Sequence, residues 1–357
     1  MRDIVKLQIG NKEISTFLSY EVDSNVLVPA DAFSGKLSRI DNSIKEGSEF
    51  KLYVNDALEM TGIIDKVTPS YSKGSQEMTI EGRDYMGLLI DMSVEEWKTI
   101  KGMALKALAK RLLKNVPYID ASKIIYGSEV EDTGKKTQNK IYGDTSTTTC
   151  QFEPGISIFD ALSDYSQRHG LLMWIEPDGS LVFGTLKDAL DSESPDYSFY
   201  CYKNGDDRKQ NNIISASNPR DLSKRYSKIT TVAQLQGTDS YGVGGHTVKK
   251  TATDGFFPFA KPLVMQSNCG SERGAEYQAE WEMKRREADS WRVEITAAGH
   301  GQDGKNYRGN RVCYIKDEVL GLDDTYLILG RKFTLDRQAG PKTVLTIGKL
   351  TEGYAVN

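Results

Sequence analysis

The sequence predicts an α+β fold that is mainly β, with two β-rich segments on either side of a smaller α+β unit. Short β-branched and aromatic runs separated by turn residues recur in the first ninety residues and again in the last part of the chain, and two amphipathic helical patterns lie between them. We therefore expect a first β-rich domain over 1–92, folded as a barrel or a sandwich, an α+β domain over 93–185 and a second β-rich domain over 186–357 whose strands suit a barrel. The last domain carries a helical and loop insertion around 236–290.

Composition limits the classes of function. The chain has 357 residues, of which 38% are hydrophobic and 27% charged, as expected for a globular protein with a buried core. Its formal net charge of -4 offers no broad cationic surface, so nucleic acid is not the default partner. The apolar runs are far shorter than the roughly 20 residues that span a bilayer, and the N-terminus lacks the apolar stretch of a secretory signal. We expect no membrane segment, and synthesis in the cytoplasm.

The first β-rich segment begins with a half-buried strand. Val5, Leu7 and Ile9 are apolar and alternate with polar residues before a turn at 10–12. Further apolar runs predict strands at 14–18, 50–54, 62–67 and 77–80. Short strands at this spacing are typical of a barrel or a sandwich.

The α+β segment begins with a change of pattern. A helix is predicted to start at Ser93, because Ser93 can cap it and Glu96 can reach back to the cap nitrogen. Apolar residues then recur at helical spacing until Pro117. They are Leu105, Leu108, Ala109, Leu112 and Leu113. The cations on the other faces favour a solvated face over an anionic-surface helix. The polar stretch 121–149 predicts a long loop.

A second helix and a hairpin complete this segment. The helix follows Pro154 and Gly155 and is closed by Gly170. Its stripe consists of Ile158, Ala161, Leu162, Tyr165 and His169. We interpret His169 as a capping or packing residue rather than a catalytic or metal-binding one. Apolar strands at 171–175 and 181–183 surround a Pro-Asp-Gly turn and predict a hairpin packed on this helix.

The second β-rich segment follows a polar stretch at 186–210, which predicts a linker or exposed arm. Strand patterns then suit a barrel at 213–216, 228–235, 291–297, 311–315, 326–335 and 343–350. A glycine-rich loop at 242–245 precedes a charged helix from about Glu272 to Asp289. Its apolar stripe is thin, so one side of the helix must be solvated or meet a polar partner.

No catalytic, cofactor-binding or metal-binding constellation is present in the sequence. The glycine-rich loop lacks the GxGxxG spacing, and Phe159 replaces the last glycine of a GxSxG motif around Ser157. Residues 300–306 lack the alternating acids of a calcium loop and predict a turn. The cysteines and histidines show no metal-site spacing, so we expect no metal, no cofactor and reduced cysteines. They are Cys150, Cys201, Cys269, Cys313, His169, His246 and His300.

Several short segments, in order along the chain, carry a family resemblance. They are residues 28–33 (VPADAF), 81–91 (EGRDYMGLLID), 158–162 (IFDAL), 170–172 (GLL), 177–183 (PDGSLVF), 307–312 (YRGNRV), 321–328 (GLDDTYLI) and 333–336 (FTLD). Residues 115–149 and 186–290 match poorly. In combination the segments resemble the baseplate hub proteins of contractile-tailed phages, specifically the Mu-like tail protein P group, which are similar to the T4-type central hub.

This resemblance implies a non-enzymatic homotrimer in which each chain supplies two similar tube-type β-barrel domains, over 1–92 and 186–357, so that three chains form a pseudo-six-fold ring. It implies the tail tube protein, the central spike protein and the baseplate wedge proteins as partners, and phage DNA that passes through the lumen without specific binding. It also implies a place in the virion tail baseplate after assembly in the host bacterial cytoplasm. Arg83 and Asp84 are expected at the closure of the first barrel or at a subunit interface, and for Arg83 we favour the structural role.

Two alternatives belong to other classes of protein. A tail-tip cell-wall hydrolase would show muralytic activity. A host-glycan-binding tail protein would bind surface glycans saturably through aromatic platforms, for which the four tryptophans are too scattered to argue.

Overall fold

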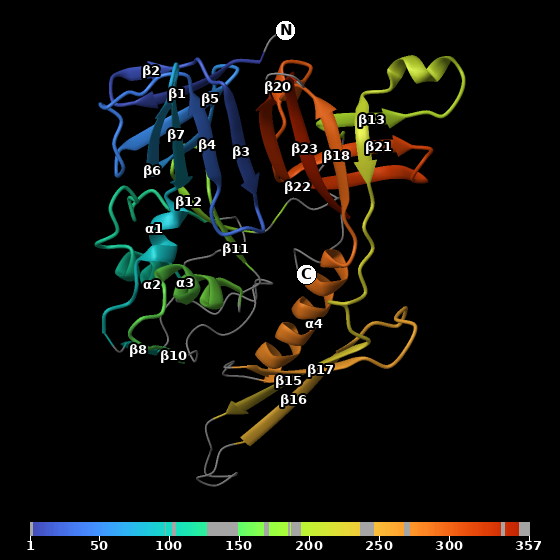
Figure 1. Ribbon diagram of the computed structural model, residues 1–357. Coiled ribbons are helices and arrows are strands. Elements are labelled where there is room, and N and C mark those ends of the chain that lie inside the picture. Colours follow the sequence, from blue (N-terminus) through green and yellow to red (C-terminus); the bar gives the residue numbers. More distant parts are fainter. Residues whose placement is uncertain are drawn as a thin grey trace.

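The structure is a computed structural model that describes most of the chain. The described residues are 3–96, 98–101, 105–126, 149–167, 171–184, 186, 194–235, 246–267, 272–336 and 340–349. They form mainly strands with a few helices, as the sequence predicts. Figure 1 shows two groups of strands side by side, with helices at one end of each group. None of the described helices combines the length and the apolar composition that a bilayer crossing requires.

The first group of strands is named the N-terminal β-unit. Its strands are β1 (Val5–Ile9), β2 (Lys12–Ile14), β3 (Ser19–Asn25), β4 (Ala32–Leu37), β5 (Glu49–Val54), β6 (Ala57–Ser72) and β7 (Ser75–Asp84). Val5 and Leu7 are buried in β1, as the alternation predicts. The run predicted at 14–18 is wrong beyond Ile14, because the next strands are β3 and β4. In β3 the buried Tyr20 and Val22 are separated by Glu21 and followed by three polar residues, so a search for apolar runs misses the strand.

The second group is named the C-terminal β-unit. Its main strands are β13 (Tyr197–Cys201), β14 (Ile213–Ser217), β18 (Val293–Ala298), β21 (Arg311–Asp317), β22 (Leu322–Asp336) and β23 (Gly340–Lys349). A small hairpin of β19 (Gly301–Gln302) and β20 (Lys305–Asn306) confirms the turn predicted at 300–306. The prediction of a linker over 186–210 is wrong in part. β13 lies within it, because Tyr197 and Phe199 become buried through pairing with β21, more than a hundred residues away.

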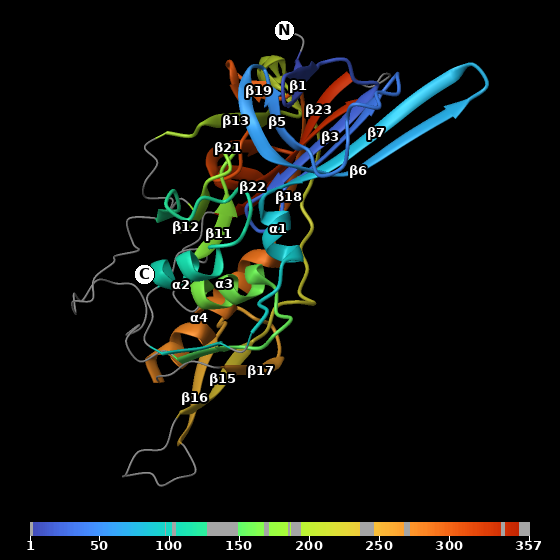
Figure 2. The same cartoon turned by 90° about the vertical axis from the view of Figure 1, so that its left-hand side faces the viewer.

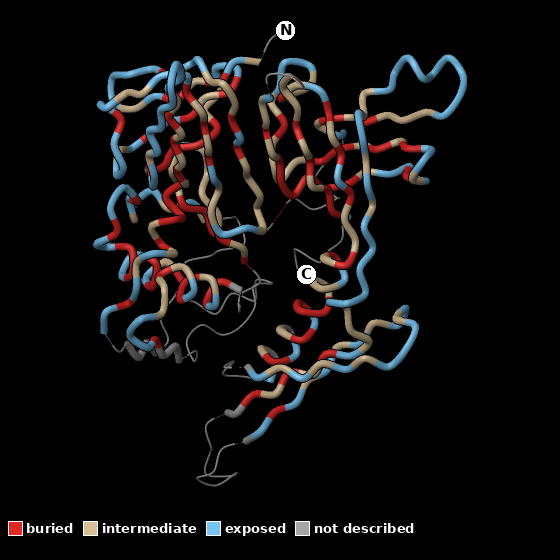
Figure 3. Tube along the Cα trace, in the orientation of Figure 1, coloured by how far each residue is buried: buried red, intermediate tan, exposed pale blue. Residues whose placement is uncertain are grey.

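One continuous sheet joins the two β-units, which corrects the expectation of two separate barrels. Its 13 described strands include both units, and they do not close into a barrel. The junction arises because β22 extends beyond its partner β21 and pairs over Gly330–Leu335 with β3 of the other unit. Buried residues from both units, among them Phe50 and Phe333, belong to one hydrophobic core. Figure 3 shows buried residues, in red, along the strands of both units.

The two β-units share one strand path, although their sequences show no repeat. Along the sheet the N-terminal β-unit runs β1-β5-β6-β7-β4-β3 and the C-terminal β-unit runs β13-β21-β22-β23-β18-β14. These strands correspond one to one in chain order. Asp65 in β6 and Leu329 in β22 occupy matching register shifts against the following strand. The units differ in two respects: β13 runs parallel to β21 whereas β1 is antiparallel to β5, and residues 218–292 replace the short β3–β4 connection.

The α+β unit lies between the two β-units in sequence. Its elements are α1 (Met86–Asp91), β8 (Lys98–Lys101), α2 (Leu105–Leu112), β9 (Ile125–Tyr126), β10 (Thr149–Phe152), α3 (Ile158–Gln167), β11 (Leu172–Ile175) and β12 (Leu181–Gly184). The predicted helix start at Ser93 is wrong, because Ser93 bridges to Ser157 in extended backbone and α2 begins at Leu105. The apolar stripes of α2 and α3 and the β11–β12 hairpin are confirmed. His169, Gly170 and most of the predicted loop lie outside the described residues.

Residues 218–292, which replace the β3–β4 connection, are named the insertion. They contain β15 (Lys228–Leu235), β16 (His246–Thr253), β17 (Pro262–Ser267) and α4 (Glu272–Asp289). The assignment of 228–235 to a barrel is wrong, because β15 pairs with β16 and β17 in a separate sheet. α4 has the predicted bounds and buries Ala275, Ala279 and Met283. The glycine-rich loop at 242–245 lies outside the described residues.

Candidate functional site: a charged junction pocket

Arg83 and Asp84 are neighbours on β7 with opposite surroundings. Successive side chains of a strand point to opposite faces of the sheet. Arg83 lies on the outer face, where Nε donates to Asp65 Oδ2 at 2.7 Å and Nη2 donates to Asp91 Oδ2 at 2.6 Å. These bonds tie the bulge of β6 to the end of α1 and raise the pKa of Arg83.

Asp84 points inward and is buried. Its Oδ1 accepts a hydrogen bond from Met86 N at 3.0 Å, which holds the turn into α1. Desolvation, followed by repulsion from Asp31, raises the pKa of Asp84 well above the ordinary value. Asp31 also has a raised pKa, caused by burial, and its carboxylate accepts from Asn25 N at 3.1 Å. The two acids are linked through the backbone as well, because Asp84 N donates to Asp31 O at 3.1 Å.

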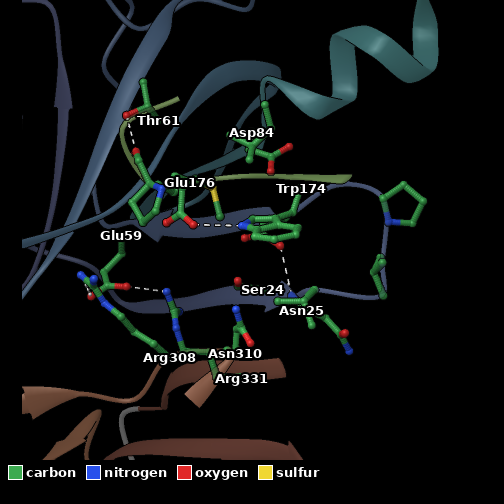
Figure 4. Close-up of a pocket in the computed structure, with 18 of the residues that line it drawn as sticks. Ser24, Asn25, Glu59, Thr61, Asp84, Trp174, Glu176, Arg308, Asn310 and Arg331 are labelled. Carbon is green, nitrogen blue, oxygen red and sulfur yellow. Dashed lines mark hydrogen bonds and ion pairs between the residues drawn. The ribbon is translucent and has the colours of Figure 1, made fainter. Parts of the chain in front are cut away.

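Asp31 and Asp84 line a pocket where three parts of the chain meet, named the junction pocket (Figure 4). The N-terminal β-unit supplies one wall, β22 and the segment that leads into β21 supply a second, and the β11–β12 hairpin supplies the third. Its labelled residues in Figure 4 are Ser24, Asn25, Glu59, Thr61, Asp84, Trp174, Glu176, Arg308, Asn310 and Arg331. The pocket is therefore the place where the three units are fixed to one another.

A buried ion pair crosses the pocket between the two β-units. Arg331 on β22 donates from Nη2 to Glu59 Oε2 on β6 at 2.6 Å, and both side chains are buried. Asn306 Nδ2 donates to Glu59 Oε1 at 2.7 Å, and the more exposed Arg308 lies 3.4 Å from the same oxygen. Arg331 also stacks over the ring of Phe333 at 4.0 Å. Glu59 is thus neutralised wholly by groups of the C-terminal β-unit.

The β11–β12 hairpin closes the pocket through its turn. Thr61 on β6 donates from Oγ1 to the carbonyl oxygen of Pro177 at 2.7 Å. Gly179 in the same turn has φ +88, and a Cβ there would lie 2.7 Å from the ring of Tyr85. Trp174 Nε1 donates to Glu176 Oε1 at 2.9 Å, so the indole has its own partner. Gly179 is required at its position, because its positive φ and the close approach of Tyr85 both disfavour a side chain there.

The chemistry of the junction pocket is that of a structural joint. A pair of carboxyls with raised pKa in a pocket is also typical of acid–base catalysis. Here, however, Asp31, Glu59 and Asp84 each accept hydrogen bonds from the fold itself. Within the described residues, no three His, Cys, Asp or Glu side chains gather as metal ligands. Buried His300 instead contacts Tyr20 and Thr343, at 2.6 and 3.3 Å.

The sequence singled out Asp84, as a residue of barrel closure or of a subunit interface, and did not point to the pocket. Glu59, Arg331 and Asp31 were missed. A usable signal existed, because Glu59 lies between apolar neighbours in a strand run and Arg331 follows an apolar run in β22. A single charge inside a buried strand implies a partner. Which residue is that partner depends on the β22–β3 junction, and the local sequence pattern does not reveal that junction.

Three highly exposed aromatic side chains lie on two outlying parts. Tyr71 is 85% exposed near the tip of the β6–β7 hairpin, which projects from the body in Figure 2. Phe256 and Phe259 are 92% and 58% exposed in the connection between β16 and β17. Exposed aromatic groups of this kind are common where another protein docks.

Comparison with known proteins finds relatives of the N-terminal β-unit and of the chain as a whole. A family model described as Mu phage baseplate assembly protein GpP-like, N-terminal, matches residues 4–84, which coincide with the N-terminal β-unit. Baseplate hub protein gp44 of Escherichia phage Mu is 23% identical over 327 residues, which cover 88% of this chain and 78% of gp44.

Two solved structures share the fold over almost the whole chain. The tail protein from Neisseria meningitidis MC58 has a TM-score of 0.81 and 26% identity, covering 98% of this chain and 97% of its own. The 43 kDa tail protein of prophage MuSo2 from Shewanella oneidensis has a TM-score of 0.75 and 21% identity, covering 97% and 98%. Residues 4–84 are thus similar to the N-terminal domain of Mu GpP-like baseplate assembly proteins, and the resemblance of the chain to Mu-like baseplate hub proteins is confirmed.

Proposed function

We propose that the chain is the structural hub of a contractile phage or prophage tail baseplate, and that it acts as a homotrimeric ring. The observation that carries this proposal is the shared strand path of the two β-units, with matching register shifts in β6 and β22. A chain with two equivalent units can place six units around a three-fold axis. Closed cyclic assemblies are the usual form of protein oligomers.

Such a ring would join two symmetries. In Figure 1 the α+β unit lies at one end of the N-terminal β-unit, and the insertion lies at the corresponding end of the C-terminal β-unit. The α+β unit and the insertion differ in structure. The end of the ring that carries them therefore has only three-fold symmetry. The opposite end is formed by the β-units themselves and can match a six-fold neighbour. We assign the six-fold end to the tail tube protein and the three-fold end to the central spike protein.

The remaining roles follow from this placement. The baseplate wedge proteins would contact the outside of the ring, and phage DNA would pass through its lumen without specific binding, in keeping with the net charge of -4. The chain would have no catalytic role, because the acids of the junction pocket stabilise the fold. It would be located in the virion tail baseplate after assembly in the host cytoplasm.

Solution mass tests the proposal directly. Sedimentation equilibrium of the purified chain across a wide concentration range should give three times the chain mass of 39.8 kDa. A monomer at every concentration, also in the presence of the spike protein, would contradict the ring. Release of fragments from purified peptidoglycan, or saturable binding to host surface glycans, would favour the hydrolase or the receptor instead.

A further inference from the structure

The β22–β3 junction occupies a strand edge whose counterpart in the other β-unit is empty. On one edge, β22 pairs first with β21 and then, beyond its bulge, with β3 over Gly330–Leu335. On the matching edge, β6 pairs with β5 up to Ile63. Beyond its bulge, residues 66–71 pair only with β7 on the opposite edge, and no strand of the described chain covers the free edge.

This free edge lies on a hairpin that projects from the body. Figure 2 shows the outer parts of β6 and β7 extending well beyond the sheet. An isolated two-stranded hairpin is only marginally stable in water, so a long one implies a covering partner. Pro69 lies within the free edge and lacks a backbone N–H, a feature of edge strands that limits unspecific pairing.

The counterpart of β3 is β14, and β14 also has a free edge. It pairs with β18 on one side, and no other described strand pairs with it. Ile214 within β14 is 51% exposed. Asn218, directly after β14, has a buried amide whose nitrogen and oxygen both lack a hydrogen-bond partner in the described chain. A buried polar group of this kind implies a missing partner.

The β22–β3 junction also specifies the register that an equivalent pairing between two copies would have. Matching the bulges at Asp65 and Leu329 makes Ser70 the counterpart of Thr334. The same comparison can be carried across the neighbouring strands, from β7 through β4 to β3 in the N-terminal β-unit and from β23 through β18 to β14 in the C-terminal β-unit. It makes Ser217 the counterpart of Glu21. Because Thr334 pairs with Glu21, a second copy would place its Ser217 opposite Ser70.

We propose that the end of β14 and the residues directly after it in one copy pair antiparallel with the free edge of β6 in the next copy, with Ser217 opposite Ser70 and residues 218–221 opposite 66–69. This inference rests on the trimeric ring proposed above and defines how its chains join. The contact repeats between chains the junction that β3 and β22 make within one chain. The sheet then continues around the ring, the projecting hairpin is covered, and the segment carrying Asn218 lies at the interface.

Thiol crosslinking tests the register. The variant with Ser70→Cys and Ser217→Cys, treated with a short bifunctional thiol reagent, should give covalent trimers on a denaturing gel, because paired residues have Cβ atoms about 5 Å apart. Both positions are exposed, so the substitutions should leave the fold intact. The native chain and each single variant, which carry the native cysteines, serve as controls. Ser43→Cys combined with Ser217→Cys is the matched pair outside the proposed contact.

Charge substitution gives a second readout. Ser70→Glu with Ser217→Glu places like charges opposite each other at every interface, which should increase trimer dissociation roughly tenfold. Ser70→Glu with Ser217→Lys should restore the native trimer. A native trimer that gives no crosslink for the Ser70–Ser217 pair would overturn the strand pairing and leave the ring standing. A chain that stays monomeric would overturn both.

Discussion

Arg331 of the C-terminal β-unit and Glu59 of the N-terminal β-unit form a buried ion pair, with 2.6 Å between Nη2 and Oε2. They lie 272 residues apart in sequence. The pair is brought together by the β22–β3 junction, because Arg331 lies within the stretch of β22 that pairs with β3. It links the correct assembly of the sheet to the satisfaction of two charges that would otherwise be buried alone.

Removing one partner of this pair should be costly. We expect Glu59→Ala and Arg331→Ala each to lower the free energy of unfolding by about 3–5 kcal/mol, because each leaves a buried charge unpaired. The double variant Glu59→Leu with Arg331→Met should cost clearly less than the sum of the single changes. Urea unfolding followed by circular dichroism measures all of these variants. A double variant that loses as much stability as the two single variants together would contradict the energetic coupling of Glu59 and Arg331.

Asp84 should make the fold less stable as pH rises. Its pKa is higher in the folded chain than in the unfolded chain, so the folded state binds more protons between the two values. The free energy of unfolding should therefore fall as pH rises from the ordinary carboxyl pKa of 3.8 through the raised value. Asp84→Asn keeps an acceptor for Met86 N and should flatten this dependence. An unchanged pH profile of urea unfolding would contradict the assignment.

His300 should act in the opposite direction. Burial lowers its pKa from 6.5 to about 4, so the folded chain holds the neutral ring. The unfolded chain then binds more protons between these values, and stability should fall by up to ~3 kcal/mol as pH drops through this window. His300→Gln should remove this slope, whatever its effect at neutral pH. The contribution of His300 is obtained by comparing the free energy of unfolding as a function of pH between the native chain and this variant.

Gly62 should tolerate no side chain. A Cβ at this position would lie 2.0 Å from the carbonyl oxygen of Arg83, which is backbone and cannot move aside cheaply. We expect Gly62→Ala to lower the free energy of unfolding by about 1–3 kcal/mol or to disrupt the β6–β7 pairing. Gly255→Ala is the matched control, because a Cβ there meets nothing within 4 Å. Equal melting temperatures for the two variants would contradict the close approach.

Arg83 distinguishes a structural role from an interface role. Its ion pairs with Asp65 and Asp91 are partly exposed, so Arg83→Ala should cost only about 1 kcal/mol of stability. The oligomeric mass should stay that of the native chain. A folded variant that dissociates would instead assign Arg83 to a subunit interface.

The sequence was most informative where local pattern decides the structure. The stripes of α2, α3 and α4 and the Pro-Asp-Gly turn of the β11–β12 hairpin were predicted, because each is specified by residues close together in the chain. β13 was missed because its burial depends on pairing with a distant strand. The start of α2 was misplaced because Ser93 is a good capping residue whose bridge to Ser157 holds it in extended backbone.

The junction pocket and the shared strand path were beyond local reasoning. The two β-units match in strand order and in the position of a bulge, which are properties of pairing rather than of composition. Glu59 and Arg331 could be recognised singly as charges within buried strands, but their meeting depends on the β22–β3 junction. That junction also replaced the expected pair of barrels with one sheet.

The most direct test of the account is single-particle imaging of the purified chain viewed along its symmetry axis. The account predicts closed rings with a central lumen, three-fold symmetry and six similar β-rich densities around the lumen, with distinct attachments on alternate densities at one end. Monomers, two-fold dimers or rings without paired β-rich densities in each chain would contradict it.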